Sequence, residues 1–462
     1  MSQAPHQDLL LAESRPGTLS MAKENPLLSG AEAHAHETKP ESPRALLVAY
    51  HYPPCITSSG LHRSVCLSRD LRDFGWCPLV LTANPRAYRE RRDDQLARVP
   101  KDVVVDRAFA LDTLRHLGFR GRYLGWMALP DPLVTWLIGA VPAGLRLIRK
   151  WRPTVIWSTY PIATAHLIAY ALHRLTGLPW VADFRDPMIE TDPDSGQKYP
   201  SDARLYSVRR MVEEATIQQC QRCVFVTPGA LQIYRERYPQ RAGDMRLVGN
   251  GFDEESFAAA PLPKNTGPRD GRPLELVHSG TLYPGPDRDA NSLLAALRQL
   301  RHEGKISAET LRIRLRATGY DEYYRERIAQ HGVADIVTLE PTLPYQAALA
   351  EMMEADGLLL FQGSTSNPAV PAKLYEYLRA RRPIFALVDD RGETAAVLRE
   401  ARLGTIVPLN SSEQIATGLL QYLEEIRKGV APIASEAEIN RHSRKHKASE
   451  MSLVFDEVAR SK

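Results

Sequence analysis

The sequence predicts an α/β protein with two doubly wound domains, each built around a parallel sheet. Short continuous apolar runs alternate with helical patterns, and this alternation occurs in two separate series. A stretch rich in Pro, Gly, Asn and charged residues, 259–273, lies between the series. Strands that are buried on both faces form continuous apolar runs, and alternating strands and helices form parallel sheets. We therefore expect ligands in a cleft at the carboxyl ends of the strands.

The first series is expected to begin at Arg44, because residues 1–43 show no sustained period and read as a disordered tail. The apolar run 45–50 is expected to be a strand, a polar loop follows at 51–60, and the next strand, 77–82, completes a βαβ unit. Later elements of this series are strands expected at 155–158, 180–183, 223–226 and 245–248 and helices expected at 163–175, 204–220 and 228–238.

The second series follows the stretch 259–273, which we interpret as the linker between two domains. Its apolar runs again alternate with helical patterns, so a second parallel sheet is expected. The strands are expected at 274–278, 311–317, 356–361, 383–387 and 405–408, and the helices at 291–301, 371–381, 412–427 and 435–458.

Composition and charge bound the classes of function. The 462 residues carry a formal net charge of +4, which is small for this length and gives no support for nucleic-acid binding. The five cysteines are too sparse for a disulfide scaffold, so a reducing compartment is expected. The sequence shows neither the pattern of a signal peptide nor an apolar run of the roughly 20 residues that span a bilayer. These observations favour a cytoplasmic protein.

The segment richest in chemistry is 367–378, which follows the strand 356–361 and opens a helix after Pro371. Lys373 and Glu376 are three residues apart and therefore share one face of that helix. A helix N-terminus favours phosphate, and Lys373 adds positive charge. Glu376 is suited to accept hydrogen bonds from two vicinal hydroxyls of a ribose. A Lys/Glu pair on a solvated helix face is the alternative interpretation.

The loop 278–288 also lies between a strand and a helix. It contains Gly280 and Thr281, where backbone N–H groups can approach a phosphate, and Arg288, whose charge suits a leaving diphosphate. It matches neither a Walker pattern nor the glycine fingerprint of dinucleotide-binding folds. An ordinary loop between a strand and a helix remains the alternative interpretation.

Five segments, taken in their order along the chain, resemble family-4-like glycosyltransferases of the GT-B fold. Each segment is short, and it is their common order that carries the resemblance, which extends from Arg44 to the final helix. The segments are Tyr52-Pro53-Pro54 with Ser59-Gly60 and Arg63, then Trp180 with Asp183-Phe184-Arg185-Asp186-Pro187, then Asn250-Gly251-Phe252-Asp253, then Ser279-Gly280-Thr281-Leu282-Tyr283, and last Pro371-Ala372-Lys373-Leu374-Tyr375-Glu376-Tyr377-Leu378.

The resemblance implies a GT-B architecture in which two Rossmann-like domains face a central cleft. It assigns acceptor binding to residues 44–260, nucleotide-sugar binding to 261–430, and to 431–462 a C-terminal helix that crosses back to the N-terminal domain. The implied activity is transfer of a sugar, of hexosyltransferase type and with retention of configuration, from a nucleotide-sugar to a glycan or lipid-linked acceptor in polysaccharide or glycoconjugate biosynthesis. It implies neither a cofactor nor an essential metal ion.

The resemblance also implies roles for the residues that bind the donor. Glu376 matches the second Glu of the family's E-x7-E motif, which grips the donor ribose. Lys373, Arg288 and the loop at Gly280 and Thr281 match the region that binds the donor phosphates.

Two further parts of the resemblance concern the cleft and the donor sugar. Gly60 and Arg63 match the loop after the first strand, which approaches the donor phosphate and the acceptor. The first Glu of the E-x7-E motif falls at Pro368, a departure from the family's pattern. Asn367, or the backbone that follows it, is therefore expected to take over the contact with the donor sugar.

The segment 183–187 lies at the carboxyl end of a strand, where it is expected to face the cleft. Asp186 is the candidate for positioning the acceptor or handling its proton, and Arg185 for orienting Asp186 or contacting phosphate. A neighbouring arginine lowers the pKa of a carboxylate, which suits an orienting residue better than a base. An ion pair that fastens the loop is the alternative. His166, on the helix 163–175, is a minor candidate for proton transfer in this cleft, since a lone histidine is more often structural.

Three other patterns carry less weight. Two of them are Asp-x-Asp patterns, which hold Mg²⁺ in other transferase folds. So short a pattern often arises by chance. A single C-x-x-C without further ligands gives weak support for zinc. We therefore expect no metal site, and buried thiols at the cysteine pair. The patterns are Asp192-Pro193-Asp194, Asp287-Arg288-Asp289 and Cys220-Gln221-Arg222-Cys223.

The segment 123–152 mixes Trp and long aliphatic residues with a basic end. Such a segment can lie in a membrane interface, and this would suit an acceptor that is carried on a lipid. A helix that faces the core and ends in a basic turn is the favoured alternative. Peripheral contact with the inner face of a membrane therefore stays open.

Two other functions share the expected fold. A GT-B sugar-nucleotide epimerase or hydrolase needs no acceptor, and a non-catalytic nucleotide-sugar-binding module needs no reacting groups. Pro368 at the place of a donor-contacting Glu keeps the second possibility open. The fold alone does not decide among these functions.

Overall fold

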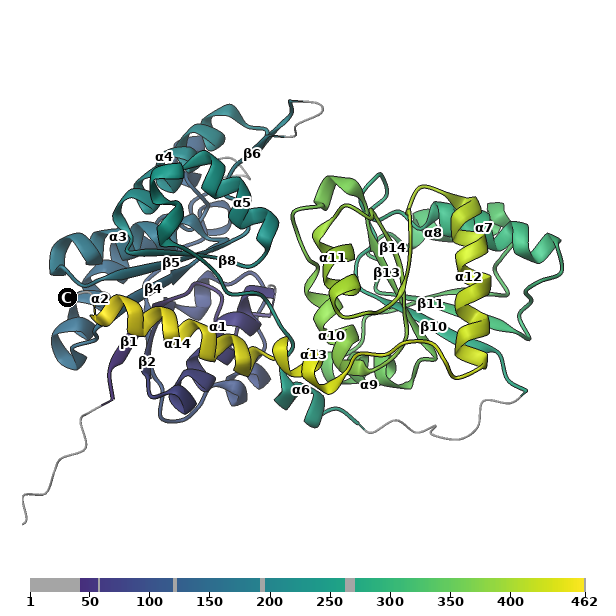
Figure 1. Ribbon diagram of the computed structural model, residues 1–462. Coiled ribbons are helices and arrows are strands. Elements are labelled where there is room, and N and C mark those ends of the chain that lie inside the picture. Colours follow the sequence, from purple (N-terminus) through teal and green to yellow (C-terminus); the bar gives the residue numbers. More distant parts are fainter. Residues whose placement is uncertain (1–41, 57–58, 119–122, 192–195, 262–270, 461–462) are drawn as a thin grey trace, which may run out of the picture. The chain divides into compact units, whose positions relative to one another are not determined.

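The computed structural model of the protein describes residues 42–56, 59–118, 123–191, 196–261 and 271–460. Within them the chain forms two separate parallel sheets, as the sequence predicts (Figure 1). The predicted tail up to residue 41, most of the linker 259–273 and the pattern Asp192-Pro193-Asp194 lie outside the described residues.

The first sheet has seven parallel strands within the described residues. Its interior strand β1 pairs with β2 on one side and with β4 on the other. Four of the five residues of β1 are buried because both faces of the sheet are covered, and this explains the continuous apolar run in the sequence. In spatial order the strands are β3 (Val104–Ala108), β2 (Cys77–Ala83), β1 (Arg44–Val48), β4 (Val155–Thr159), β5 (Trp180–Arg185), β8 (Arg222–Phe225) and β9 (Met245–Leu247).

Helices cover both faces of the first sheet. One face carries α2 (Trp136–Trp151), α3 (Ala163–Thr176), α4 (Ala203–Gln219) and α5 (Pro228–Arg237). The other face carries α1 (Ser59–Asp70) and α14 (Arg444–Arg460), which share one apolar core with β4. Figure 1 shows α14, in yellow, beside α1. The predicted crossing of the C-terminal helix to the N-terminal sheet is confirmed.

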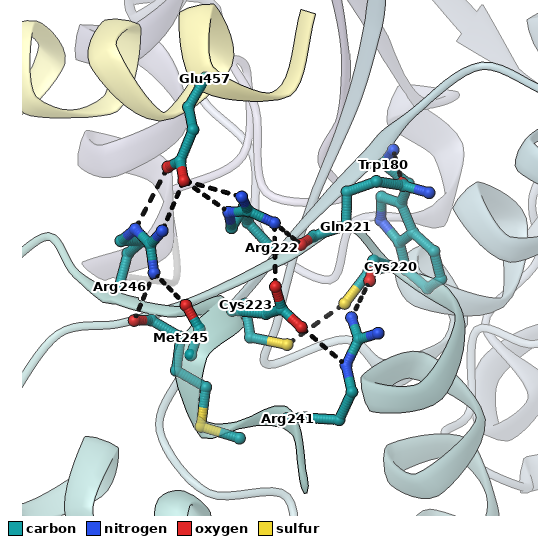
Figure 2. A network of polar contacts seen from close by, with 11 residues as sticks. Trp180, Cys220, Gln221, Arg222, Cys223, Arg241, Met245, Arg246 and Glu457 are labelled. Atoms are coloured by element: carbon teal, nitrogen blue, oxygen red, sulfur yellow. Dashed lines mark hydrogen bonds and ion pairs between the residues drawn. The ribbon is translucent and has the colours of Figure 1, made fainter. Parts of the chain in front are cut away.

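A charged cluster fastens α14 to the edge of the first sheet (Figure 2). Glu457 of α14 accepts hydrogen bonds from Arg222 Nη2 at 2.7 Å and Arg246 Nη2 at 2.5 Å. These two guanidinium groups lower the pKa of Glu457 to about 2, so the carboxylate stays charged under ordinary conditions. The thiols of Cys220 and Cys223 lie 3.2 Å apart beside this cluster.

The helix expected at 435–458 is divided into two. A short helix, α13 (Glu436–Arg441), ends before α14 begins, and Ser443 between them forms a parallel bridge with Phe252. A Cβ atom at Gly251 would lie 2.3 Å from the carbonyl oxygen of His442, so only glycine allows the two segments to approach so closely. The interruption therefore comes from a backbone contact made by a distant segment.

The second sheet has six parallel strands within the described residues. One face carries α7 (Asn291–His302), α8 (Asp321–His331) and α12 (Ser412–Arg427), and the other carries α9 (Tyr345–Glu354), α10 (Ala372–Ala380) and α11 (Glu393–Glu400). In spatial order the strands are β12 (Val337–Glu340), β11 (Leu311–Arg316), β10 (Leu274–Ser279), β13 (Gly357–Gln362), β14 (Ile384–Val388) and β15 (Thr405–Val407). The sequence did not predict α8, β12, α9 or α11.

Candidate active site

Arg63 and Asp183 form a buried ion pair at the carboxyl edge of the first sheet. Arg63, on α1, donates from Nε to Oδ2 of Asp183 at 2.7 Å and from Nη2 to Oδ1 at 3.0 Å. It also donates to the carbonyl oxygens of Val248 at 3.1 Å and Gly249 at 2.9 Å. The guanidinium of Arg63, which was expected to approach the donor phosphate and the acceptor, therefore forms an ion pair within the protein. The sequence placed Asp183 in a motif but did not indicate it as the partner of Arg63.

Gly60 lies in the first turn of α1, where its carbonyl oxygen accepts a hydrogen bond from Ser64 Oγ at 3.1 Å. The loop expected to extend to this residue is shorter, because the helix already begins at Ser59. No acidic residue occupies the first turn of α1. The positive end of the helix dipole at Gly60 is therefore compatible with an anion.

Arg185 and Asp186, which are neighbours in the sequence, differ in exposure. Arg185 is buried, has φ 59° and donates from Nη1 to the carbonyl oxygen of Tyr160 at 3.5 Å. Burial lowers the pKa of Arg185, and the charges of Asp186 and Asp183 act in the opposite direction. A left-handed backbone at a residue with a side chain is strained, and such strain clusters at functional sites. Asp186, the next residue, is exposed, and its role in positioning the acceptor stays a prediction.

His166 does not line a cleft, contrary to the expectation from the sequence. Its side chain has no exposed surface, and its ring lies 5.1 Å from the ring of Phe184. Nδ1 shares a hydrogen bond of 2.7 Å with Ser158 Oγ. Burial lowers the pKa of His166 to about 3, so the ring stays neutral. The residue is part of the core between α3 and the first sheet.

Lys373 lies at the N-terminal end of α10, beside the loop that follows β10. Its Nζ contacts Nε2 of His278 at 3.2 Å, while Nδ1 of His278 contacts the carbonyl oxygen of Leu359 at 2.8 Å. A carbonyl can only accept, so Nδ1 carries the hydrogen and Nε2 accepts from Lys373. A Cβ atom at Gly280, whose φ is 120°, would lie 2.7 Å from Nζ. Glycine therefore makes room for the ammonium group, and the sequence missed His278 as its anchor.

Arg288 and Thr281 complete the loop around Lys373. The guanidinium of Arg288 lies 5.7 Å from the ring centre of Tyr283, and its Nε is 3.3 Å from Oδ2 of Asp287. Its charge is close enough to Lys373 to lower the pKa of that lysine. Thr281 is partly exposed on the same loop. The structure thus brings together Lys373, Arg288 and the loop at Gly280, as the sequence predicts, and their binding of donor phosphate stays a prediction.

Glu376 shares the face of α10 that carries Lys373. Tyr345, the first residue of α9, donates from Oη to Oε1 of Glu376 at 2.6 Å. Burial raises the pKa of Glu376, whereas this hydrogen bond and the charges of Arg444 and Lys373 act in the opposite direction. A carboxylate that is held at one oxygen and shielded from bulk water is suited to accept hydrogen bonds from hydroxyl groups. The sequence contained no signal for Tyr345.

Asn367 has a structural partner on a neighbouring loop. Its side-chain Nδ2 donates to Oδ2 of Asp389 at 3.0 Å, and its backbone carbonyl oxygen accepts from the backbone N–H of Glu393, the first residue of α11, at 2.9 Å. The side chain and the backbone of Asn367 thus both contact the turn between β14 and α11. The expected contact of Asn367 with the donor sugar stays a prediction.

The affinity of this site for a nucleoside diphosphate is expected to fall as the pH rises above 7. Burial first and Arg288 second lower the pKa of Lys373 to about 7, and Glu376 opposes them. Only the protonated amine carries the charge that attracts phosphate, so each pH unit above 7 should weaken binding by up to about tenfold. Titration calorimetry between about pH 7 and pH 9 measures the effect, since an unperturbed lysine would give a flat profile there.

Lys373→Arg provides the control for this pH dependence. Arginine stays charged throughout the range, so the variant should show a profile with little slope. A flat profile in the unmodified protein would contradict the assignment of Lys373 to the phosphate.

The described residues contain no group of three or more His, Cys, Asp or Glu side chains arranged to hold a metal ion. Cys220 and Cys223 are buried free thiols, as predicted from the sequence. Within the part of the chain that the structure describes, no helix combines the length and the apolar character needed to cross a membrane.

Comparison with known proteins connects this geometry to a family. Residues 63–251 match the family model of the glycosyl transferase 4-like domain. No curated protein matches the chain.

Solved structures share the fold over almost the whole chain. The sucrose-phosphate synthase of Thermosynechococcus elongatus is 15% identical, with a TM-score of 0.61 over 91% of this chain and 100% of that chain. The lipopolysaccharide outer core galactosyltransferase WaaB is 11% identical, with a TM-score of 0.55 over 90% and 99% of the two chains. A UDP-N-acetylglucosamine 2-epimerase is 12% identical, with a TM-score of 0.54 over 90% and 96%. At such identities the likeness concerns the fold.

Proposed function

Since the chain is a GT-B protein with a glycosyl transferase 4-like domain over residues 63–251, we propose that it transfers a hexose from a nucleotide-sugar to a glycan or lipid-linked acceptor. The observation that carries this proposal is the face of α10 with Lys373 and Glu376, which meets the loop at Gly280. It joins a cationic group for phosphate with a carboxylate for ribose hydroxyls.

In the proposed reaction, the bond between the anomeric carbon and the diphosphate oxygen breaks. A hydroxyl oxygen of the acceptor bonds to the same carbon, and its proton leaves to the medium or to the departing phosphate. Lys373 and Arg288 stabilise the charge that develops on the diphosphate, and Glu376 holds the ribose. These cations supply the charge that a metal ion provides elsewhere, so we expect chelation of divalent ions to leave the rate unchanged.

Exposed Asp186 is the proposed acceptor-positioning residue, next to the strained backbone of Arg185. Buried His166 has no place in this scheme, because its neutral ring is enclosed by the core. The family resemblance implies retention of configuration at the anomeric carbon. Determining the anomer of the product by nuclear magnetic resonance tests that expectation.

Turnover of a panel of labelled nucleotide-sugars, with and without candidate acceptors, tests the proposed function. Release of nucleoside diphosphate that depends on an acceptor is the expected result. Release without an acceptor, or conversion of the donor sugar alone, would instead establish a hydrolase or an epimerase, which the shared fold allows. Binding without turnover of any donor would leave a nucleotide-sugar-binding module.

Four exposed apolar side chains between residues 109 and 138, here called the apolar cluster, favour an acceptor that is carried in a membrane. Leu124, Trp126 and Ile138 are 61%, 69% and 71% exposed. The backbone and Cβ of Phe109 lie against Gly139 on α2, next to Ile138, and Phe109 is also exposed. Large exposed apolar side chains that form a patch mark sites of protein or membrane contact, and we propose that these residues form one.

The charges around this apolar cluster are complementary to an anionic surface. Arg146, Arg149 and Lys150 are exposed on α2. Between residues 109 and 152 the sequence has only two carboxylates, Asp112 and Asp131, and both are buried. We therefore propose that the protein contacts anionic phospholipid peripherally at the cytoplasmic face of a membrane.

The double variant Leu124→Ser and Trp126→Ser is expected to bind vesicles of anionic phospholipid at least about tenfold more weakly, because it removes two apolar side chains that would enter the interface. Co-sedimentation with the vesicles measures the loss. Leu175→Ser is the matched control, since Leu175 is 64% exposed on α3 outside the cluster. Equal binding by the double variant and the unmodified protein would contradict the membrane contact without affecting the proposed reaction.

A further inference from the structure

Arg444, the first residue of α14, is a buried cation that forms no ion pair with a described residue. Only 8% of its surface is exposed. Its backbone N–H donates to the carbonyl oxygen of Phe252 at 2.8 Å, but its guanidinium forms no hydrogen bond or ion pair with any described residue. A buried charge is unfavourable unless it is paired and hydrogen-bonded. Glu376 attracts this charge electrostatically but forms no ion pair with it, so the guanidinium of Arg444 is suited to pair with an anionic ligand.

Arg444 lines a small cavity between the first turns of α14 and the body of α1. The cavity has a volume of about 20 Å³, and Arg63 and Lys447 are among its lining residues. No acidic side chain lines it, and no acidic residue lies in the first turn of α1 or of α14. Three cationic side chains and the N-terminal part of α14 thus surround a space that admits one water-sized group.

The other two cations have partners of their own. Arg63 is paired with Asp183, and Lys447 donates from Nζ to Oε1 of Glu450 at 2.9 Å. The uncompensated charge in the cavity is therefore that of Arg444. Its field also reaches the proposed donor site, because it acts to lower the pKa of Glu376 and that of Tyr345.

We propose that Arg444 binds a phosphate group, so that α14 contributes a ligand-binding residue to the active site. A guanidinium can donate two hydrogen bonds to a phosphate, and one phosphate oxygen fits the size of the cavity. The inference rests on the proposed function for the identity of the ligand. The phosphate belongs either to the diphosphate of the donor or to a phosphorylated acceptor.

Titration calorimetry with inorganic pyrophosphate, at low ionic strength, tests the role of Arg444. We expect Arg444→Gln to weaken pyrophosphate binding at least about tenfold, the effect of losing one charge-assisted hydrogen bond. Lys445→Gln is the matched control, because Lys445 is the next residue of α14, is 62% exposed and is paired with Asp73 at 2.6 Å. Lys445→Gln changes the net charge by the same amount as Arg444→Gln. It should leave the affinity for pyrophosphate within about twofold of that of the unmodified protein.

Arg444→Gln also distinguishes loss of binding from loss of folding. The variant removes an unpaired buried charge, so the ligand-free protein should melt at the same temperature or a higher one. Pyrophosphate binding that is equal in Arg444→Gln and the unmodified protein would overturn the proposal. So would an equal loss in Arg444→Gln and Lys445→Gln, or an unmodified protein that binds neither pyrophosphate nor inorganic phosphate.

Competition experiments identify the source of the phosphate. If a nucleoside diphosphate displaces pyrophosphate from the unmodified protein, Arg444 serves the donor. If inorganic phosphate still binds through Arg444 at saturating nucleoside diphosphate, Arg444 serves a phosphorylated acceptor. Pyrophosphate has no ribose, so Glu376→Ala should retain its binding. Binding of pyrophosphate through Arg444 in a protein that binds no nucleotide would support this inference while the proposed function fails.

Discussion

Replacing Glu376 by alanine is expected to weaken the binding of nucleoside diphosphates by roughly 100-fold or more. Tyr345 holds Oε1 of Glu376, so Oε2 is the oxygen that we expect to accept the ribose hydroxyls. Hydrogen bonds to a charged group contribute about 1.5–3 kcal/mol each, and two are lost. A ligand present at about 100 times its dissociation constant stabilises a protein by about 2.7 kcal/mol. The corresponding rise in melting temperature should disappear in the variant.

Two further variants make the Glu376 experiment specific. Glu413→Ala, an exposed residue in the first turn of α12, removes the same charge far along the chain and should bind nucleotide normally. Tyr345→Phe removes a hydrogen bond that lowers the pKa of Glu376, so the carboxyl should protonate at a higher pH. Nucleotide affinity in that variant should therefore begin to fall at a higher pH during acidification. Retention of nucleotide binding by Glu376→Ala would contradict the ribose contact.

Replacing Asp183 by alanine is expected to lower the free energy of unfolding by about 3–5 kcal/mol, because it leaves Arg63 as a buried, unpaired charge. Asp183 has no exposed surface and accepts two hydrogen bonds from Arg63 and one from Thr159. Scanning calorimetry of the ligand-free protein measures the loss. The effect should exceed that of most single substitutions.

The ion pair between Arg72 and Asp102 provides the comparison for Asp183. Both of its members are exposed, so Asp102→Ala should change the free energy of unfolding by no more than about 1 kcal/mol. The double variant Arg63→Met and Asp183→Leu should regain much of the stability lost in Asp183→Ala, since it removes both buried charges. If Asp183→Ala lowered the free energy of unfolding no more than Asp102→Ala does, the ion pair between Arg63 and Asp183 would contribute little to stability.

Most strands of both sheets were predictable because strands buried on two faces leave continuous apolar runs, as at residues 45–50 and 356–361. The edge strands β3 and β12 were not predicted, because most of their residues are only partly buried or exposed. The helix α8 was not, because it has charged or polar side chains on most of its surface and buries only Tyr324 and Ile328. A helix with so narrow an apolar stripe has little periodicity to detect. The sequence therefore predicted the sheets more completely than the helices that cover them.

The candidate site was predictable only where its residues are close in the sequence. Lys373 and Glu376 are three residues apart, and helical geometry places them on one face. Their partners are distant, since His278 is 95 residues from Lys373 and Asp183 is 120 residues from Arg63. Such pairs depend on the tertiary fold, which spacing does not encode.

For His166, the type of residue suggested a role that the structure does not support. Histidine suits proton transfer by its chemistry, but the face of α3 that carries it packs on the first sheet. Residue type suggested a function that burial excludes. The exposure of a side chain follows from packing between elements, and a single histidine in an apolar helix gives no sign of it.

The crossing of α14 has a consequence for how the protein is made. Phe455 packs against Trp76 with ring centres 5.3 Å apart, and Glu457 closes the charged cluster on β8 and β9. The ribosome must therefore synthesise the whole second sheet before the core of the first can close. A fragment cut between residues 262 and 270 would leave Trp76 and its neighbours without their cover. Such a fragment should bind chaperones or aggregate unless α14 is supplied as a separate peptide or rejoined by circular permutation.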